Sequence, residues 1–181
     1  MAKITKRTQG VLEFVEVLFL DEMEQIVRHE GAAFLKFLIL LQGIEFLGSC
    51  YDSLPFAERG QSEIRFNRGL GRLGHKYIKY TERGHHQYFY DFFRSPMIHQ
   101  FKHDQRKITL ATENSVWYEE VHLTLNPEGR VYVVLERFYE DIRRAAMDLI
   151  EQVKSGELKI DKLKDPYLTI TTIEELRIQT T

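Results

Sequence analysis

The chain has 181 residues, with 25 Lys and Arg against 27 Asp and Glu, and 43% of it is hydrophobic. This is an ordinary composition for one soluble globular domain, which we place over residues 1–181. The single cysteine excludes an internal disulfide framework, and Glu13 and Glu16 interrupt the apolar run after the basic start, so we expect a cytoplasmic protein without a signal peptide.

The net charge of −2 hides a strong partition along the chain. Residues 1–58 carry a net charge of −4 and residues 108–181 one of −5. Residues 59–107 carry 11 basic and 4 acidic side chains, or +7, together with five of the seven histidines. A polyanion such as RNA is the natural partner of this segment. The alternative is a solvated charged face that pairs with the acidic ends of the same chain.

The first predicted helix covers residues 11–29 and ends at Gly31. Its apolar residues recur at helical spacing, namely Leu12, Val15, Phe19, Met23 and Ile26.

A second helix is predicted over residues 32–50, and it is apolar almost all round. Lys36, Gln42 and Glu45 interrupt it, which favours the central helix of a bundle over a membrane span, so no membrane partner is expected. Because Glu45 lies among apolar neighbours, it needs a cationic or hydrogen-bonding partner, or else a place at the surface. Arg94 is a candidate partner.

The third helix is predicted over about 61–82, after a connection with Pro55 and Gly60. Its apolar residues are Phe66, Leu70, Leu73, Tyr77 and Tyr80. A second stripe is basic and consists of Arg65, Arg68, Arg72, Lys76, Lys79 and Arg83. Six basic residues on one helical line indicate a phosphate-facing surface. Gly69, Gly71 and Gly74 lower helix propensity and are compatible with a close helix approach.

An aromatic segment from His86 to Phe101 reads HQYFYDFFRSPMIHQF and combines a large apolar area with an arginine and two histidines. We expect a helix over about 86–94 that kinks at Pro96, or that restarts there with Ser95 as its cap. The break would re-phase the chain and let Arg94 and His99 point into one site.

Three strands are predicted next, at residues 107–112, 121–125 and 130–135, with a hairpin turn at residues 126–129 between the last two. A final helix covers residues 136–154, and the peripheral tail 157–181 holds a short strand at 168–173. We therefore expect a mainly α fold. It is a four- to five-helix up-down bundle with a small antiparallel β-hairpin or three-stranded insertion before the last helix.

The spacing of Arg94, four intervening residues and His99, within a mostly helical chain, resembles the Arg-x4-6-His motif of the HEPN superfamily of small helical domains. The resemblance implies an RNA-directed protein, often a metal-independent endoribonuclease of a toxin–antitoxin or defence system. His99 would act as general acid or base on a ribose 2′-hydroxyl, and Arg94 would hold the phosphate. No cofactor is implied. Two positions depart from the family pattern: Ser95 follows the arginine, and Phe101 stands where one subgroup has tyrosine.

The resemblance also implies a homodimer with paired motifs, because one Arg94/His99 pair cannot supply acid, base and charge stabilisation together. Tyr88, Phe92 and Met97 are the apolar candidates for the centre of that contact. An antitoxin protein is a further expected partner.

Two alternatives compete with the nuclease interpretation. His85, His86, His99 and His103 form a cluster that could hold a metal ion, although the HQFKH segment lacks the glutamate of the zinc-protease helix. The chain could also be a non-catalytic helical module that binds a protein or nucleic acid through its basic helix.

Overall fold

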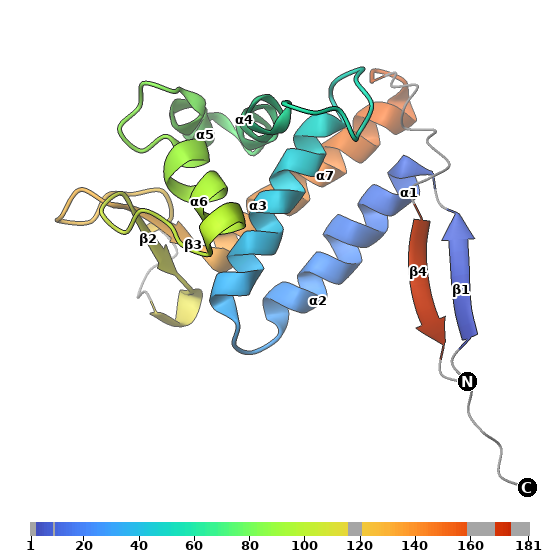
Figure 1. Cartoon of the computed structure of the whole chain (residues 1–181), viewed down its shortest axis with the longest axis horizontal. Coiled ribbons are helices and arrows are strands. Elements are labelled where there is room, and N and C mark those ends of the chain that lie inside the picture. The colour runs from blue at the N-terminus through green and yellow to red at the C-terminus, as the bar shows by residue number, and fades with distance from the viewer. Residues whose placement is uncertain (1–2, 9, 116–120, 159–168, 175–181) are drawn as a thin grey trace, which may run out of the picture.

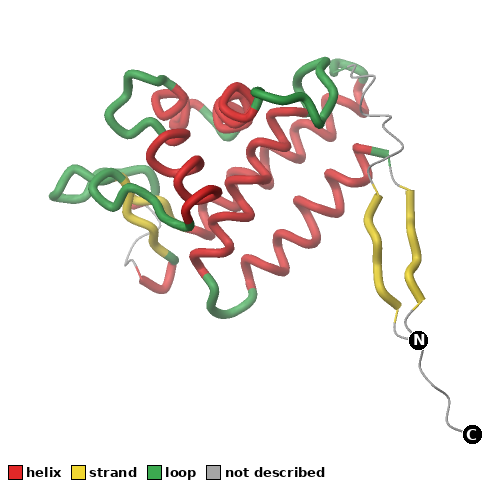
Figure 2. The backbone as a smooth tube through the Cα atoms, viewed as in Figure 1, coloured by secondary structure: helices red, strands yellow, loops and turns green. Residues whose placement is uncertain are grey.

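Helices dominate the computed structural model, which describes residues 3–8, 10–115, 121–158 and 169–174; the mainly α fold is confirmed (Figure 2). The α-helices are α1 (Val11–Glu16), α2 (Met23–Arg28), α3 (Ala33–Ser49), α4 (Ser62–Arg72), α5 (His75–Ile78), α6 (Ser95–Gln100) and α7 (Leu135–Ser155). One π-helical segment covers Val17–Glu22 and another covers Tyr90–Arg94. Short 3-10 turns cover Lys79–Thr81 and Glu113–Ser115. The strands are β1 (Lys3–Thr8), β2 (Ile108–Ala111), β3 (Val131–Val134) and β4 (Thr169–Glu174).

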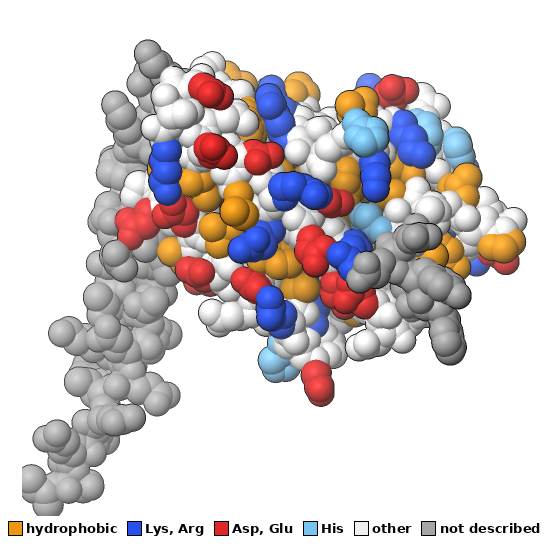
Figure 3. Space-filling view, turned by 180° about the vertical axis from the view of Figure 1, so that it is seen from behind, with side chains coloured by type: hydrophobic (Ala, Val, Ile, Leu, Met, Phe, Trp, Pro, Cys, Tyr) orange, Lys and Arg blue, Asp and Glu red, His pale blue; other side chains and the backbone are white. Residues whose placement is uncertain are grey.

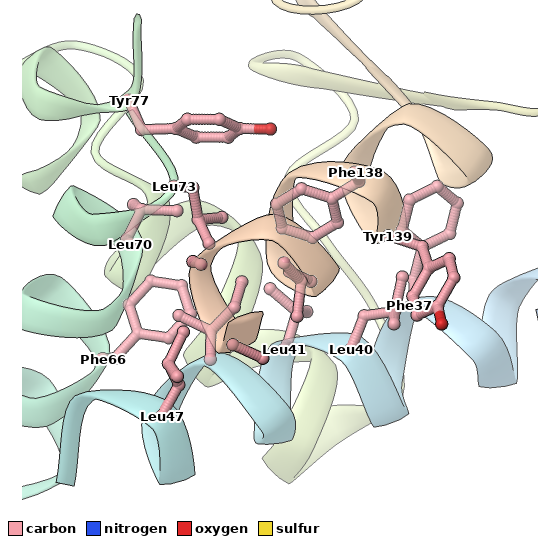
Figure 4. Close-up of a cluster of buried hydrophobic side chains, with 14 of the residues drawn as sticks. Phe37, Leu40, Leu41, Leu47, Phe66, Leu70, Leu73, Tyr77, Phe138 and Tyr139 are labelled. Atoms are coloured by element: carbon pink, nitrogen blue, oxygen red, sulfur yellow. The ribbon is translucent and has the colours of Figure 1, made fainter. Parts of the chain in front are cut away.

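The central helix is α3, as predicted. It runs between the α1–α2 segment and the group formed by α4, α5 and α6, and α7 crosses behind it (Figure 1). Figure 4 shows side chains from α3, α4, α5 and α7 meeting in one cluster, in which Phe37, Phe66 and Phe138 are fully buried. In the described part of the chain, no helix has the length and apolarity to cross a membrane.

The first predicted helix forms as one continuous helical segment from α1 through the π-helical turn to α2. Its buried residues recur every fourth position, at Val11, Val15, Phe19, Met23 and Val27. A regular α-helix would rotate such a series away from the core, whereas the wider π turn absorbs the drift. Val27 is therefore buried where we predicted Ile26, which is 37% exposed.

The helices α3 and α4 cross at two glycines with their backbones in contact. A Cβ atom on Gly48 would lie 1.8 Å from the carbonyl oxygen of Arg65, and one on Gly69 would lie 2.0 Å from that of Ile44. Neither carbonyl can move aside without breaking its helix. The close approach that we predicted for the glycines of this region is thus made by Gly69, together with Gly48.

The predicted helix over 61–82 is interrupted, which corrects our assignment. α4 ends at Arg72, and Gly74 takes φ +126° and ψ 168°, a conformation incompatible with a helix and accessible to glycine. α5 and the 3-10 turn then run in a new direction. The apolar residues predicted for this helix are nevertheless all buried, because the bend keeps Tyr77 and Tyr80 against the core.

The predicted β-hairpin is also corrected. The turn at residues 126–129 forms, with Gly129 N–H donating to Asn126 O at 2.9 Å. Leu123, however, takes φ +63°, so residues 121–125 are not an extended strand, and an isolated antiparallel bridge joins Leu125 to Val131. Backbone bonds still join the two segments, because Leu123 N–H donates to Tyr132 O at 2.8 Å and Tyr132 N–H donates to Thr124 O at 2.9 Å. β3 pairs in addition with β2, in parallel, with Ile108 opposite Val131.

The strand predicted at 168–173 is present as β4, one residue later. It pairs antiparallel with β1, which the sequence did not predict, and Lys3 lies opposite Glu174. Together the two strands form a ribbon beside the helices (Figure 1). The final helix, α7, matches its predicted span within one residue at each end.

The glycine crossing gives a first prediction. Gly48→Ala and Gly69→Ala should each lower the free energy of unfolding by about 3 kcal/mol or more, because the new methyl group meets backbone atoms. Gly71→Ala is the matched control on α4: its Cβ would meet nothing within 4 Å. It should raise the free energy of unfolding by about 0.5 kcal/mol. Urea-induced unfolding followed by circular dichroism gives all three values, and equal effects of the three substitutions would contradict the close crossing.

Candidate functional site

Arg94 ends the second π-helical segment, and α6 continues from Ser95 without a break. Pro96 has no N–H to donate to the carbonyl of Phe92, four residues earlier. That carbonyl accepts the N–H of Asp104 at 2.9 Å instead. Arg94 and Ser95 both have helical backbone angles, so the π turn passes into α6 without the restart that we predicted, and Ser95 is not a cap.

The Arg94 side chain is 5% exposed and forms an ion pair with Glu45 on α3. Its Nη2 also donates to Gln42 Oε1 at 3.4 Å, and its guanidinium lies 5.6 Å from the centre of the Tyr90 ring. Ser62 donates to the same Glu45 carboxylate at 2.9 Å. Arg94 is therefore the partner that Glu45 was expected to need, and the pair fastens the start of α6 to α3.

His99 lies on the opposite, exposed side of α6. The helix ends at the next residue, Gln100, and the C-cap residue Phe101 takes φ 51° and is 66% exposed. Arg94 thus points toward α3 while His99 points toward solvent. The structure does not bring the two motif residues into one site within a single chain.

The three apolar residues predicted for the centre of a dimer contact are not exposed on the surface. Tyr88 and Met97 are 1% and 0% exposed, and Phe92 is half-buried. The hydroxyl of Tyr88 donates to Glu63 at 2.8 Å and accepts from Asn67 at 2.7 Å. Tyr88 and Met97 belong to the protomer's own core and cannot form the centre of an interface.

Two of the six predicted basic residues are structural. Arg65 is 4% exposed; its Nε donates to Asp52 Oδ2 at 2.9 Å, and its two Nη atoms donate to the carbonyls of Phe56 and Pro55, each at 2.7 Å. Arg68 donates to the same Asp52 oxygen at 2.8 Å. These bonds attach the connection between α3 and α4 to α4, so Arg65 has no exposed donor for a phosphate.

The remaining basic residues lie on the surface. Arg83 is paired with Glu63 at 2.7 Å. Arg72, Lys76 and Lys79 are exposed, and among the described residues none of the three forms an ion pair. We call these three residues the basic patch. Figure 3 shows Lys, Arg and His side chains gathered at the end of the molecule that carries α5.

The histidine cluster proposed as a metal site is dispersed. The rings of His85 and His86 are 4.6 Å apart, but His99 is exposed on α6 and His103 is half-buried, where burial lowers its pKa. Over the residues that the structure describes, no three His, Cys, Asp or Glu side chains gather in a way that could hold a metal ion.

A buried polar network, which the sequence did not reveal, joins three elements. The Tyr77 hydroxyl donates to Asp141 Oδ2 at 2.7 Å and lies 2.7 Å from His122 Nε2. Because His122 Nδ1 accepts the Val134 N–H at 3.0 Å, the neutral ring carries its proton on Nε2 and donates it to Tyr77. Burial, and then the charges of Lys76 and Arg137, lowers the His122 pKa to about 4.

Comparison with protein-family models, with curated proteins and with solved structures finds no match for this chain. The HEPN resemblance therefore depends on the spacing of Arg94 and His99 and on the residues that flank them.

The buried His122 predicts a pH dependence of stability. Its pKa is about 4 in the folded protein, against 6.5 for an unperturbed histidine, so the unfolded chain binds the proton first, and stability falls as pH drops from 6.5 toward 4. Between about pH 7.5 and about pH 5 the loss from this group should be about 2 kcal/mol. His122→Gln should remove most of this loss, whereas His103→Gln should leave it nearly intact. Urea titrations at the two pH values measure it, and an unchanged loss in His122→Gln would contradict the assignment.

Proposed function

We propose that the protein binds RNA through the basic patch and is an RNA-directed, helical up-down protein of the HEPN type. The observation that supports RNA binding is the contrast within one stretch of chain. Arg65, Arg68 and Arg83 form ion pairs with carboxylates, whereas the residues of the basic patch are exposed and form no ion pair with other described residues. Within the basic patch, the Arg72 guanidinium lies over the Tyr51 ring, 4.1 Å from its centre. Such a group of like charges favours a polyanion, since binding phosphates releases counterions.

The surroundings of the basic patch favour single-stranded RNA. The break at Gly74 places Arg72 on α4 and Lys76 on α5, so the basic patch extends over the bend between the two helices. His75 is exposed between them, and Ile78 is 51% exposed. An imidazole ring and an apolar side chain beside cations give unstacked bases a surface to pack on, which a regular duplex could not use.

For cleavage, the proposal assigns the proton transfers to His99. Its exposed imidazole can take the proton of a ribose 2′-hydroxyl, whose oxygen then attacks the adjacent phosphorus. The 5′-oxygen leaves with a proton from the imidazolium of a second His99, and a 2′,3′-cyclic phosphate remains. Arg94 has a positioning role instead of the phosphate contact that the resemblance implies, because its ion pair with Glu45 fixes α6. A homodimer through α6 would add a second His99, with the exposed Phe101 in the contact.

A second candidate function is the non-catalytic helical module, whose partner could be an antitoxin protein or a nucleic acid. The burial of Arg94 favours it, because a guanidinium that is 5% exposed cannot reach a phosphate without opening the α3–α6 contact. The two candidates share the basic patch and differ in what His99 does.

The RNA-binding proposal is tested by charge reversal. Lys76→Glu/Lys79→Glu should weaken the binding of single-stranded RNA at least about tenfold. The affinity should also depend less steeply on salt: the magnitude of the slope of log affinity against log salt should fall by about 1.4, or about 0.7 for each lost contact. Arg59→Glu/Lys154→Glu changes the net charge equally at exposed positions outside the basic patch. It should leave slope and affinity nearly unchanged. Fluorescence anisotropy over a salt series measures both, and equal losses in the two variants would refute a specific patch.

The cleavage proposal is tested with His99→Ala in the presence of a chelator. The wild type should cleave single-stranded RNA, and the variant should lose about 100-fold or more of that activity. Because the His99 side chain is exposed, the urea unfolding midpoint of the His99→Ala variant should equal that of the wild type. Arg94→Ala should instead lower the free energy of unfolding by about 3 kcal/mol, since it leaves the Glu45 charge without its partner. If the wild type binds RNA but cleaves it no faster than His99→Ala does, the cleavage proposal is refuted and the non-catalytic module is the remaining candidate.

A further inference from the structure

A small pocket opens next to the basic patch, between the start of α5 and the middle of α7. It has a volume of about 280 Å³, and Gly74, Lys76, Tyr77, Asp141 and Arg144 are among its lining residues. Lys76 belongs to both the pocket and the basic patch. Arg144 comes from α7 and is therefore contributed by an element outside the patch.

The pocket presents positive charge. Lys76 and Arg144 are cations, and His75 also lines the wall. Asp141 is the one carboxylate among the lining residues, and both of its oxygens are engaged: Oδ1 accepts from Arg144, and Oδ2 accepts from Tyr77. The Arg144 side chain is 64% exposed and retains further N–H groups for a ligand.

The wall of the pocket is held in place by the buried network. Tyr77 is 1% exposed and is bonded to both His122 and Asp141, and the Val134 N–H fixes the His122 ring from β3. Asp141 in turn holds Arg144 beside the opening. A cation held by a fixed carboxylate loses less freedom when it binds an anion than a free surface lysine does.

We propose that this pocket binds a phosphate monoester, and that this group is the terminal phosphate of the RNA held by the basic patch. The inference rests on the proposed RNA binding. Asp141 offsets one of the two cations, so the lining carries a net charge of about +1 with His75 neutral. A monoester carries a charge of about −1.5 to −2 near neutral pH and three terminal oxygens, so it can accept hydrogen bonds from Lys76 and Arg144 together and attract them more strongly than an internal diester with its single charge. The volume is near the lower end of ligand pockets, which are about 300–1,000 Å³. A volume of this size suits a single terminal phosphate better than a stretch of several nucleotides.

The experiment compares one short single-stranded RNA in three forms: with a 5′-phosphate, with a 3′-phosphate and with hydroxyls at both ends. Fluorescence anisotropy should show that one of the phosphorylated forms binds about tenfold more tightly than the hydroxyl form. Arg144→Gln should remove this preference while leaving the affinity for the hydroxyl form within about twofold. Arg143→Gln is the matched control, since Arg143 precedes Arg144 on α7 and does not line this pocket. It should retain the preference.

Each contrary result has its own meaning. Equal affinities of the three RNAs for the wild type would overturn the pocket inference and leave RNA binding through the basic patch intact. A preference that persists in Arg144→Gln at an unchanged unfolding midpoint would also overturn it. If adenosine 5′-monophosphate binds as tightly as the phosphorylated RNA, the assignment to an RNA end is wrong. Failure of the wild type to bind any of the three RNAs would refute the proposed function and this inference together.

Discussion

The backbone contact between α3 and α4 is the constraint on which the placement of the other elements depends. With Gly48 and Gly69 at the crossing, α4 lies close enough for Phe66 and Leu70 to enter the core. The same closeness lets Arg65 reach Asp52 and hold the connection between the two helices. A side chain at either glycine would move α4 outward, and with it the bend at Gly74 and the cations that follow.

The arginines of this chain divide into two kinds, which sequence spacing alone does not separate. Arg65 and Arg94 are buried, and each meets a carboxylate. Arg65 also donates to backbone carbonyls, so its desolvation is offset inside the fold, whereas the Arg94 Nε is buried without a hydrogen-bond partner among the described residues. Arg72 remains exposed, although it lies in the same basic series as Arg65. A motif arginine can therefore be a packing element, and its role follows from where its guanidinium lies.

Patterns within short stretches of the sequence predicted the features that depend on neighbouring residues alone. The spans of α3 and α7 follow from their apolar patterns, and the Glu45–Arg94 pair follows from the cost of a lone buried charge. The shift from Ile26 to Val27 depends on a π turn, and the parallel pairing of β3 depends on where β2 lies; neither leaves a local pattern. The same holds for Tyr77, His122 and Asp141, which come from separate elements and meet only through tertiary packing.

The ribbon of β1 and β4 joins the two ends of the described chain, with the whole helical body between them in sequence (Figure 2). Closing so long a loop in an unfolded chain is opposed by entropy, and two strands alone are marginally stable. We therefore expect the ribbon to form late in folding and to open at a lower free energy than the helical body. Either strand without the other would expose a row of unpaired backbone groups, so a truncation at one terminus alters the other terminus as well.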